Sequence, residues 1–303
     1  MRRAIPRLVF GLVLAVVSWA GAAHAALQPG DRIIDVGGGV QIHVVVAGSP
    51  GARAPLVLIP GWTMTTDIWR EQIAEFSRDR QVIALDPRSQ GASTKTAVGD
   101  TPEQRAADLE AVLTKLDLHG LVLVGWSQGG QDVAAYVGKV GTARLKGIVI
   151  VDTAVSAGAA AIGKAPDGAA ETFGRMAIYA EQPRAYLAGM MRFIISRPLP
   201  AAEMDRIVAA STQTPPAIGT AMLVADEFGV DRTPTLAKFD RPTLVIAAAT
   251  SDELDAQKAM AARMPQGRIE IVAGAAHAVF IDQPERFDAL LRAFLAQVDK
   301  TPG

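Results

Sequence analysis

The chain has 303 residues, of which 50% are hydrophobic, and its 30 Lys and Arg nearly balance its 31 Asp and Glu. A formal net charge of −1 lacks the basic excess of nucleic-acid-binding proteins and of proteins held on membranes by polybasic segments, so both classes are excluded. Cysteine is absent, which excludes disulfides, thiolate nucleophiles and thiolate metal sites. A chain of this length and hydrophobic content can bury a large core without such crosslinks.

The first 25 residues are predicted to form a secretory signal peptide. Three arginines within the first seven positions precede an apolar stretch over 8–19, and Ala-His-Ala at 23–25 supplies the small residues of a cleavage site. The apolar stretch is shorter than the roughly 20 residues that a membrane-spanning helix needs. We therefore expect cleavage after Ala25, export to the periplasm or the medium, and no stable membrane anchor in the mature protein.

Strands and helices alternate along most of the remaining chain. Two β-rich runs over 32–36 and 40–46, joined by three glycines, predict a hairpin. Further on, buried strands are expected at 56–59, 81–85, 121–124, 147–151, 243–248 and 268–272, and helices at 68–78, 101–116, 131–137, 255–263 and 284–298. Continuous apolar strands alternating with helices predict an α/β fold with a mostly parallel sheet covered on both faces.

The alternation breaks between about 153 and 234. This stretch carries helical patterns, several methionines and proline-rich joints, and it has no convincing strand. We expect a helical cap over 154–234, inserted after the sixth strand, with 26–153 and 235–303 forming the α/β core. Its methionines are most simply explained as filling of an apolar core.

The pentapeptide Gly-Trp-Ser-Gln-Gly over 125–129 lies between the apolar strand at 121–124 and the next predicted helix. This context is typical of a nucleophile elbow, a tight turn that presents its serine above the sheet. Ser127 is therefore the predicted nucleophile. The N–H of Gln128, at the start of the helix, is free to bind a developing oxyanion. The alternative is a glycine-flanked turn in which Ser127 only caps the helix.

A serine hydroxyl needs a general base, and after signal cleavage three histidines remain. His43 lies inside an alternating strand at the start of the fold. His119 precedes the strand of the elbow, at the opposite end of the sheet from Ser127. His277 follows the last strand in a Gly-Ala-rich loop and fits the nucleophile–acid–base order along the chain, so it is the predicted base.

Several further motifs resemble those of the α/β-hydrolase superfamily over nearly the whole mature chain. Ile-Pro-Gly-Trp at 59–62 is similar to the His-Gly-x oxyanion loop, with Pro60 in place of His. Asp-Pro-Arg-Ser-Gln-Gly-Ala-Ser at 86–93 is similar to D-x-R-G-x-G-x-S, with Ser89 in place of Gly. Gly-Ala-Ala-His at 274–277 and the segment 282–287 resemble the G-x-x-H loop and last helix. The resemblance is greatest to serine esterases and to the cofactor-free haloperoxidase and perhydrolase branch. It implies an oxyanion hole made by the backbone N–H groups of Trp62 and Gln128.

Two aspartates are candidates for the acid that orients the imidazole. Asp152 directly follows the strand at 147–151, and Asp252 lies beyond the strand at 243–248. Most superfamily members place the acid after the later strand, but Asp252 is one residue out of register there. Some members use the earlier position, about 25 residues after the nucleophile, where a buried carboxylate needs a partner. We favour Asp152 and keep Asp252 as the alternative.

These features predict a serine hydrolase that cleaves a small, largely apolar carboxylic ester through an acyl-enzyme on Ser127. No metal or organic cofactor is expected, and the only expected partner is the small-molecule ester. One alternative keeps the triad but lets peroxide resolve the acyl-enzyme, as in a cofactor-free perhydrolase or haloperoxidase. Another is a non-catalytic protein that binds a small molecule under the cap. Dehalogenases and epoxide hydrolases of the superfamily carry aspartate at the elbow, which argues against both.

Overall fold

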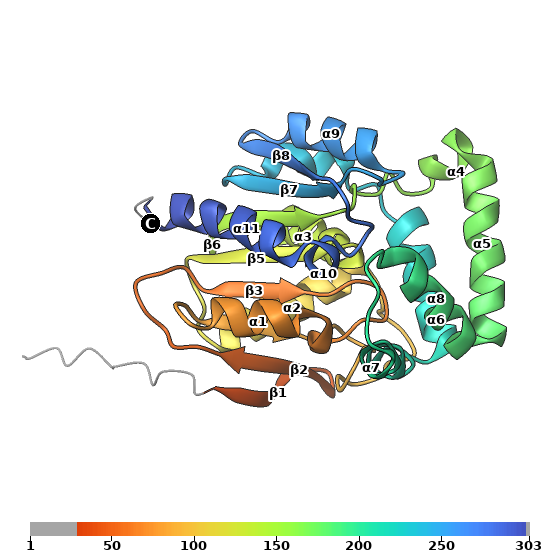
Figure 1. Cartoon of the computed structure of the whole chain (residues 1–303), viewed down its shortest axis with the longest axis horizontal. Coiled ribbons are helices and arrows are strands. Elements are labelled where there is room, and N and C mark those ends of the chain that lie inside the picture. Colours follow the sequence, from red (N-terminus) through yellow and green to blue (C-terminus); the bar gives the residue numbers. More distant parts are fainter. Residues whose placement is uncertain (1–28, 301–303) are drawn as a thin grey trace, which may run out of the picture.

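The computed structural model describes residues 29–300, so the signal peptide predicted for 1–25 lies outside the described residues. Eight strands form one sheet in the order β1-β2-β4-β3-β5-β6-β7-β8 (Figure 1). Their bounds are β1 Gly30–Gly37, β2 Val40–Ala47, β3 Leu56–Ile59, β4 Val82–Leu85, β5 Leu121–Trp126, β6 Leu145–Val151, β7 Thr243–Ala248 and β8 Gly267–Val272. The hairpin β1–β2 runs antiparallel to the rest, and β3 to β8 are parallel. The predicted mostly parallel α/β sheet is confirmed.

Helices cover both faces of the sheet (Figure 1). One face carries α1 (Arg70–Phe76) and α11 (Pro284–Asp299). The other carries α2 (Pro102–Lys115), α3 (Gln128–Lys139) and α9 (Leu254–Arg263). The continuous apolar strand pattern follows from this arrangement, because neither face of the central strands meets water.

Alternate residues of one strand belong to different cores. In β3, Leu56 and Leu58 pack into the core under α1 and α11, whereas Val57 and Ile59 pack into the core under α2 and α3. Successive side chains of a strand point to opposite faces, so four apolar residues in a row serve both layers. All four are at most 1% exposed.

Two elements differ from the sequence expectation in detail. The helix predicted over 68–78 is a 3₁₀ turn, η1 (Thr66–Trp69), followed by α1, and Thr65 caps the turn by accepting from the N–H of Asp67 at 3.4 Å. A short helix, α10 (Val279–Asp282), lies between β8 and α11. Helices this short carry little periodic signal, so the apolar pattern gave no separate indication of them.

The segment between β6 and β7 consists mainly of helices that stand beyond one edge of the layers in Figure 1. They are α4 Ala160–Lys164, α5 Pro166–Glu181, α6 Pro183–Ile194, α7 Ala201–Ser211 and α8 Pro216–Phe228, with the 3₁₀ helix η2 (Thr233–Lys238) leading back to the core. Proline occupies the first turn of α5, α6 and α8, where its missing N–H has no intrahelical partner to lose. We refer to α4–α8 as the cap.

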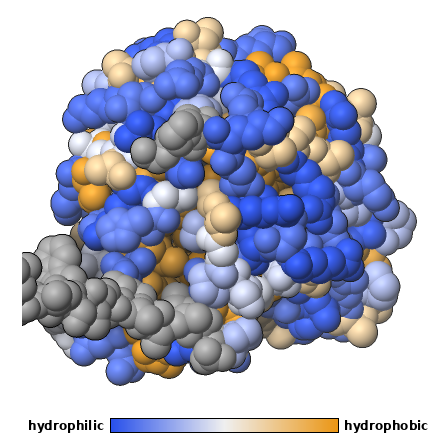
Figure 2. All heavy atoms as spheres, turned by 90° about the vertical axis from the view of Figure 1, so that its left-hand side faces the viewer, coloured by the Kyte–Doolittle hydropathy of each residue, from blue (hydrophilic) through white to orange (hydrophobic). Residues whose placement is uncertain are grey.

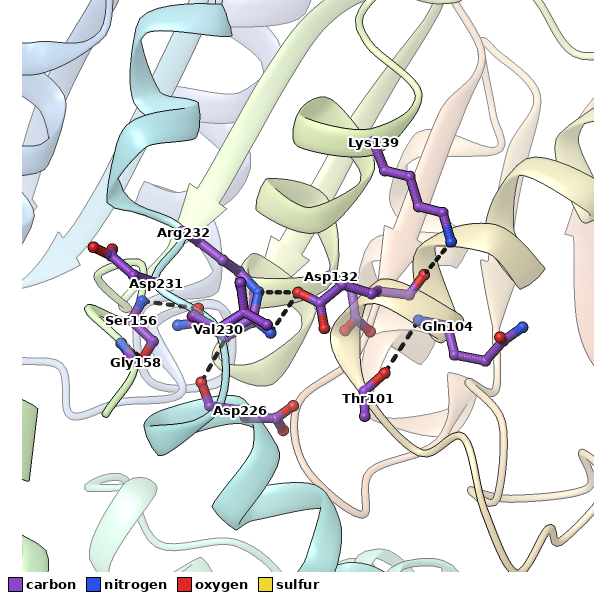
Figure 3. A network of polar contacts seen from close by, with 12 residues as sticks. Thr101, Gln104, Asp132, Lys139, Ser156, Gly158, Asp226, Val230, Asp231 and Arg232 are labelled. Atoms are coloured by element: carbon purple, nitrogen blue, oxygen red, sulfur yellow. Dashed lines mark hydrogen bonds and ion pairs between the residues drawn. The ribbon is translucent and has the colours of Figure 1, made fainter. Parts of the chain in front are cut away.

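The cap joins the core through a buried network of charges. Arg105 of α2 donates to Asp132 of α3 at 2.8 Å and to Asp226 of α8 at 2.6 Å. Arg232, after the cap, donates to Glu103 at 3.0 Å and to the carbonyl of Asp226 at 3.2 Å (Figure 3). Burial raises the pKa of Asp226 to about 7, although the guanidinium of Arg105 opposes the shift. Such a network holds the cap in one orientation, because each charge needs its partner when water is excluded.

The surface on the side of the molecule remote from the cap is mostly hydrophilic. Figure 2 shows that hydrophilic side chains cover most of this side, with apolar residues scattered between them. None of the helices within residues 29–300 combines the length and the apolar character needed to cross a membrane.

Candidate active site

Ser127 lies in a strained turn between β5 and α3. Its backbone has φ 55° and ψ −122°, a conformation that costs energy for a residue with a Cβ and that is typical of functional sites. A Cβ on Gly125 would lie 2.3 Å from the carbonyl oxygen of Gly129, and one on Gly129 would lie 2.5 Å from that of Ile59. Glycine is therefore required at both positions by the close approach of strand and helix, as expected for an elbow.

The alternative in which Ser127 only caps α3 finds no support in the contacts. Ser127 occupies the N-cap position, but its side chain accepts no hydrogen bond from the helix. Its backbone N–H donates to the carbonyl of Val151 at 3.1 Å, which ties the elbow to the end of β6. The hydroxyl is thus left available for another role.

His277 and Asp152 form a hydrogen-bonded pair at the ends of the strands. Nδ1 of His277 lies 2.9 Å from Oδ2 of Asp152, which is 2% exposed. The second carboxylate oxygen accepts from the N–H of Ala248 at 2.8 Å and from Nε2 of Gln257 at 3.2 Å. These contacts use both oxygens and satisfy the buried charge. Gln257, on α9, was not identified from the sequence, because a glutamine within a helix has no distinctive local pattern.

The other candidate residues lie elsewhere. Asp252 is exposed in the turn after β7, and the carboxylate that contacts His277 among the described residues is that of Asp152. His119 is exposed beside Asp117. His43 is largely buried and contacts Asp86 at 2.8 Å. Of the three histidines in the described chain, only His277 lies at the strand ends near the elbow.

Trp126, which precedes Ser127, supports the histidine loop from below. Its ring is 1% exposed and lies 5.4 Å from the ring of His277, and its Nε1 donates to the carbonyl of His277 at 3.0 Å. It also packs against Phe280 and Trp69. These contacts place Trp126 in the packing between the elbow, the histidine loop and the core under α1 and α11.

Asp282 links the histidine loop to the cap. Its Oδ2 accepts from the N–H of Ala276 at 2.7 Å, and its Oδ1 accepts from those of Ser196 and Arg197, each at 2.9 Å. The N–H of Ala278 donates to the carbonyl of Ile194, the last residue of α6. The position of the imidazole is therefore coupled to the end of the cap. The sequence pattern included Asp282 only as part of a family motif.

The loop after β3 lies directly against the elbow. A Cβ on Gly61 would lie 3.2 Å from Cβ of Ser127, so the Gly61–Trp62 peptide is close to the nucleophile. The side chain of Trp62 points into the cap, where Nε1 donates to the carbonyl of Gly219 at 2.8 Å and the ring contacts Tyr179 at 4.7 Å. The backbone of Trp62 therefore lies near the nucleophile while its ring contacts the cap.

Asp86 braces this loop from below. Its Oδ1 accepts from the N–H of Thr66 at 2.6 Å, and its Oδ2 accepts from that of Ala92 at 2.9 Å and contacts Nδ1 of His43. Burial alone would raise the pKa of Asp86, but the hydrogen bonds from His43, Thr66 and Ala92 outweigh it and lower the pKa. The neighbouring Arg88 is held by Asp108 through two 2.7 Å contacts. Both side chains therefore bind protein groups and hold the loops around the elbow.

Within residues 29–300, no group of three or more His, Asp or Glu side chains is arranged to hold a metal ion. The site brings together the elbow of Ser127 and an imidazole in contact with a buried carboxylate.

Comparisons with known proteins identify the family and the fold. The family model "Alpha/beta hydrolase family" matches residues 56–290. A non-heme chloroperoxidase of Kitasatospora aureofaciens is 31% identical over 260 residues, which cover 81% of this chain and 93% of that protein. A bromoperoxidase of Bacillus anthracis has a similar structure (TM-score 0.78, 22% identity, 88% of this chain and 100% of that one). An esterase from a Rhodococcus species is also similar (TM-score 0.74, 24% identity, 88% and 99%).

Proposed function

This chain belongs to the α/β-hydrolase family, and we propose that it is a serine hydrolase that cleaves a small, largely apolar carboxylic ester. The observation that carries the proposal is the 2.9 Å contact between His277 and Asp152 beside the strained elbow of Ser127. A serine hydroxyl becomes a nucleophile when a base takes its proton, and the base must be held in the correct tautomer by a third group. We assign these roles to Ser127, His277 and Asp152.

The proposed reaction has two halves. Ser127 Oγ attacks the ester carbonyl while Nε2 of His277 takes its proton, and the N–H groups of Trp62 and Gln128 stabilise the oxyanion. The intermediate collapses to an acyl-enzyme, and His277 gives the proton to the departing alcohol. Water then attacks the acyl-enzyme with His277 again acting as base, and the acid and free Ser127 are released.

The preference for an apolar ester rests on the residues of the cap. Met176, Tyr179 and Leu187 of the cap belong to the same apolar cluster as Trp62 and Met64 from the loop at the elbow. A site next to this cluster favours apolar acyl groups, because their transfer from water is favourable.

The mechanism is tested by replacing the nucleophile. Ser127→Ala is expected to lower kcat for a p-nitrophenyl ester by about 10⁴- to 10⁶-fold, as found when the nucleophile of comparable triads is removed. Circular dichroism and thermal unfolding check that the variant is folded. If folded Ser127→Ala protein hydrolysed the ester with the same kcat as wild type, the mechanism would be refuted.

A cofactor-free perhydrolase reaction is the second candidate, and the observation in its favour is the similarity to proteins named chloroperoxidase and bromoperoxidase. In this reaction hydrogen peroxide attacks the acyl-enzyme in place of water, and the resulting peracid oxidises halide. The two reactions are separated by measuring ester hydrolysis and peroxide-dependent bromination with the same acyl donor. If the acyl-enzyme forms at the same rate in both assays but releases peracid faster than acid, the perhydrolase reaction is favoured.

A non-catalytic binding protein is the third candidate, and a fluorophosphonate probe distinguishes it. The proposal predicts that the probe labels wild-type protein at Ser127, which peptide mass spectrometry locates. Absence of labelling together with absence of ester turnover would favour a binding protein.

We also propose that the protein is exported after removal of residues 1–25. The basis is the composition of the leader and the Ala-His-Ala sequence at 23–25. Fractionation of expressing cells, with mass spectrometry of the mature N-terminus, is expected to give a protein that begins at Ala26. A protein that keeps its leader in the cytoplasmic fraction would contradict this.

A further inference from the structure

Gln90 lies between the two halves of the proposed oxyanion hole. It follows β4 in the segment 86–93, and it is fully buried. Its Nε2 donates to the carbonyl of Gly61 at 3.0 Å and to that of Met64 at 2.6 Å. Its Oε1 lies 3.0 Å from the side-chain amide of Gln128. One side chain therefore contacts the loop that contains Trp62 and the residue that follows the nucleophile.

The contact with Gly61 acts on the oxyanion donor itself. The carbonyl of Gly61 and the N–H of Trp62 belong to one peptide group, which is planar, with its oxygen and hydrogen on opposite sides. A donor fixed on the oxygen therefore fixes the direction of the N–H. Hydrogen bonds in a chain also polarise one another, so the contact with Gly61 strengthens the N–H of Trp62 as a donor.

The two donors of the Gln90 amide both serve the loop after β3. An amide nitrogen offers two N–H donors, and those of Gln90 reach the carbonyls of Gly61 and Met64. The Gln90 amide also lies beside the side chain of Gln128, which is 4% exposed and packs against Arg105 and Asp226.

The backbone of Gln90 is itself fixed. Its N–H donates to the carbonyl of Pro87 at 2.9 Å, and its carbonyl accepts from the N–H of Ser93 at 3.0 Å. The next residue, Gly91, has φ 46°, and a Cβ there would lie 2.1 Å from Oδ2 of Asp86. The amide is therefore presented from a rigid loop, as a group that orients others must be.

From these contacts we propose that Gln90 is a positioning residue that sets the orientation of the Trp62 N–H in the oxyanion hole. The inference rests on the proposed serine hydrolase function. Preorganised donors stabilise the charge that develops in the transition state more than they stabilise the bound ester. Loss of Gln90 should therefore lower kcat and leave KM nearly unchanged.

The test compares Gln90→Met, which keeps the volume but removes the amide, with Gln81→Met. Gln81 is also buried (3% exposed), at the start of β4, and its Nε2 makes no hydrogen bond. With a p-nitrophenyl ester, Gln90→Met is expected to lower kcat by about 10- to 100-fold, which is part of the loss seen when a whole oxyanion donor is removed. Its KM should stay within about 2-fold of wild type, because ground-state binding is not the interaction removed. Gln81→Met should match wild type in both constants.

A tetrahedral inhibitor separates positioning from a merely structural role. A trifluoromethyl ketone forms an oxyanion adduct with the serine, so its Ki should rise in Gln90→Met by the same factor by which kcat/KM falls. A general loss of structure would instead raise KM and lower the amount of Ser127 that a fluorophosphonate finally labels. If folded Gln90→Met protein had the same kcat/KM and the same Ki as wild type, the inference would be overturned.

Two further variants keep the test decisive if Gln90→Met does not fold. Gln90→Glu keeps the shape but places an acceptor against the carbonyls of Gly61 and Met64, so kcat should fall with KM nearly unchanged. Gln128→Met leaves the contacts of Gln90 with Gly61 and Met64 in place, so its effect on kcat should be smaller than that of Gln90→Glu. A wild-type kcat in Gln90→Glu would overturn the inference. A wild-type protein that neither turns over esters nor takes the fluorophosphonate would instead refute the proposed function.

Discussion

Asp152 and His277 are 125 positions apart in the chain, and their side chains meet at 2.9 Å where β6 ends and the loop after β8 begins. The other oxygen of Asp152 is occupied by the N–H of Ala248 and by Gln257. Hydrogen bonds from β7 and α9 therefore hold the carboxylate in the orientation in which its other oxygen contacts the imidazole. This arrangement keeps the proton of a neutral His277 on Nδ1 and leaves Nε2 free to accept the proton of a nucleophile.

The assignment of the acid is tested by two amide substitutions. Asp152→Asn keeps the shape but favours the wrong tautomer of His277, so kcat for a p-nitrophenyl ester is expected to fall by about 10³- to 10⁴-fold. Asp252→Asn removes an exposed carboxylate that does not contact His277, and kcat should stay close to wild type. The reverse ranking of the two variants would assign the role to Asp252.

The sheet and the elbow were predictable because their signals are local. Four apolar residues in a row mark a strand buried on both faces, and Gly125 and Gly129 mark a close approach of strand and helix. His277 was identified by elimination among few histidines and by its place after the last strand. The strands and the elbow need only a short window of sequence, whereas the assignment of His277 also uses the order of the elements along the chain.

The partner of His277 was not predictable in the same way. Asp152 and Asp252 both follow strands, and which carboxylate meets the imidazole depends on the backbone at the strand end. Asp152 has φ 45°, and its N–H donates to Ile246 of the adjacent strand. Such a conformation is set by neighbouring elements, so the residues around Asp152 do not indicate it.

Gln90 and Arg105 were missed for a related reason. Gln90 contacts carbonyl groups 29 and 26 residues away, and Arg105 contacts Asp226 across 121 residues. Neither a glutamine in a loop nor an arginine on a helix has a local pattern that identifies a distant partner. Their contacts follow from how the cap and the loops pack on the sheet.

Removal of Arg105 is predicted to destabilise the protein strongly. Arg105→Met leaves Asp132 and Asp226 buried without their shared guanidinium, and loss of one partner of a buried ion pair typically costs about 3–5 kcal/mol of unfolding free energy. Urea unfolding followed by circular dichroism measures this change. Lys258→Met is the control, because it breaks an exposed contact with Asp255 at 3.0 Å and should change stability by less than about 1 kcal/mol. Similar small effects in both variants would show that the buried network contributes little.

A methyl group at Gly61 is predicted to reduce activity without unfolding the protein. Its Cβ would lie 3.2 Å from Cβ of Ser127 and 3.2 Å from the ring of Trp126, so the oxyanion loop must move by a few tenths of an ångström. Misplacement of this size at a catalytic donor is expected to lower kcat by about 10-fold. Steady-state kinetics with Gly51→Ala as the control measures this, because a Cβ at Gly51 meets nothing within 4 Å. An unchanged kcat in Gly61→Ala would argue against Trp62 as an oxyanion donor.

The contact between His43 and Asp86 is predicted to make stability depend on pH. The hydrogen bond from Asp86 raises the pKa of His43 above its ordinary value of 6.5, and burial opposes this only in part. A raised pKa in the folded state means that protonated His43 stabilises the protein fully below about pH 6.5, and that this contribution is lost as pH rises through the folded-state pKa. Asp86, whose pKa is lowered, must also be ionised, so the contribution fades again well below pH 4.

Unfolding free energies of wild type and His43→Gln, measured in urea from pH 4.5 to 9, test this. The difference should be about 1–2 kcal/mol at pH 5–6, where the charged hydrogen bond is complete, and should shrink toward pH 9. His119→Gln serves as the control, since that ring is exposed at the other end of the sheet. Asp86 also accepts from the N–H of Thr66 at the start of η1, and this contact does not involve His43, so kcat of the folded His43→Gln variant should stay close to wild type. A difference that is constant across this pH range would show that the His43–Asp86 contact is not charge-assisted.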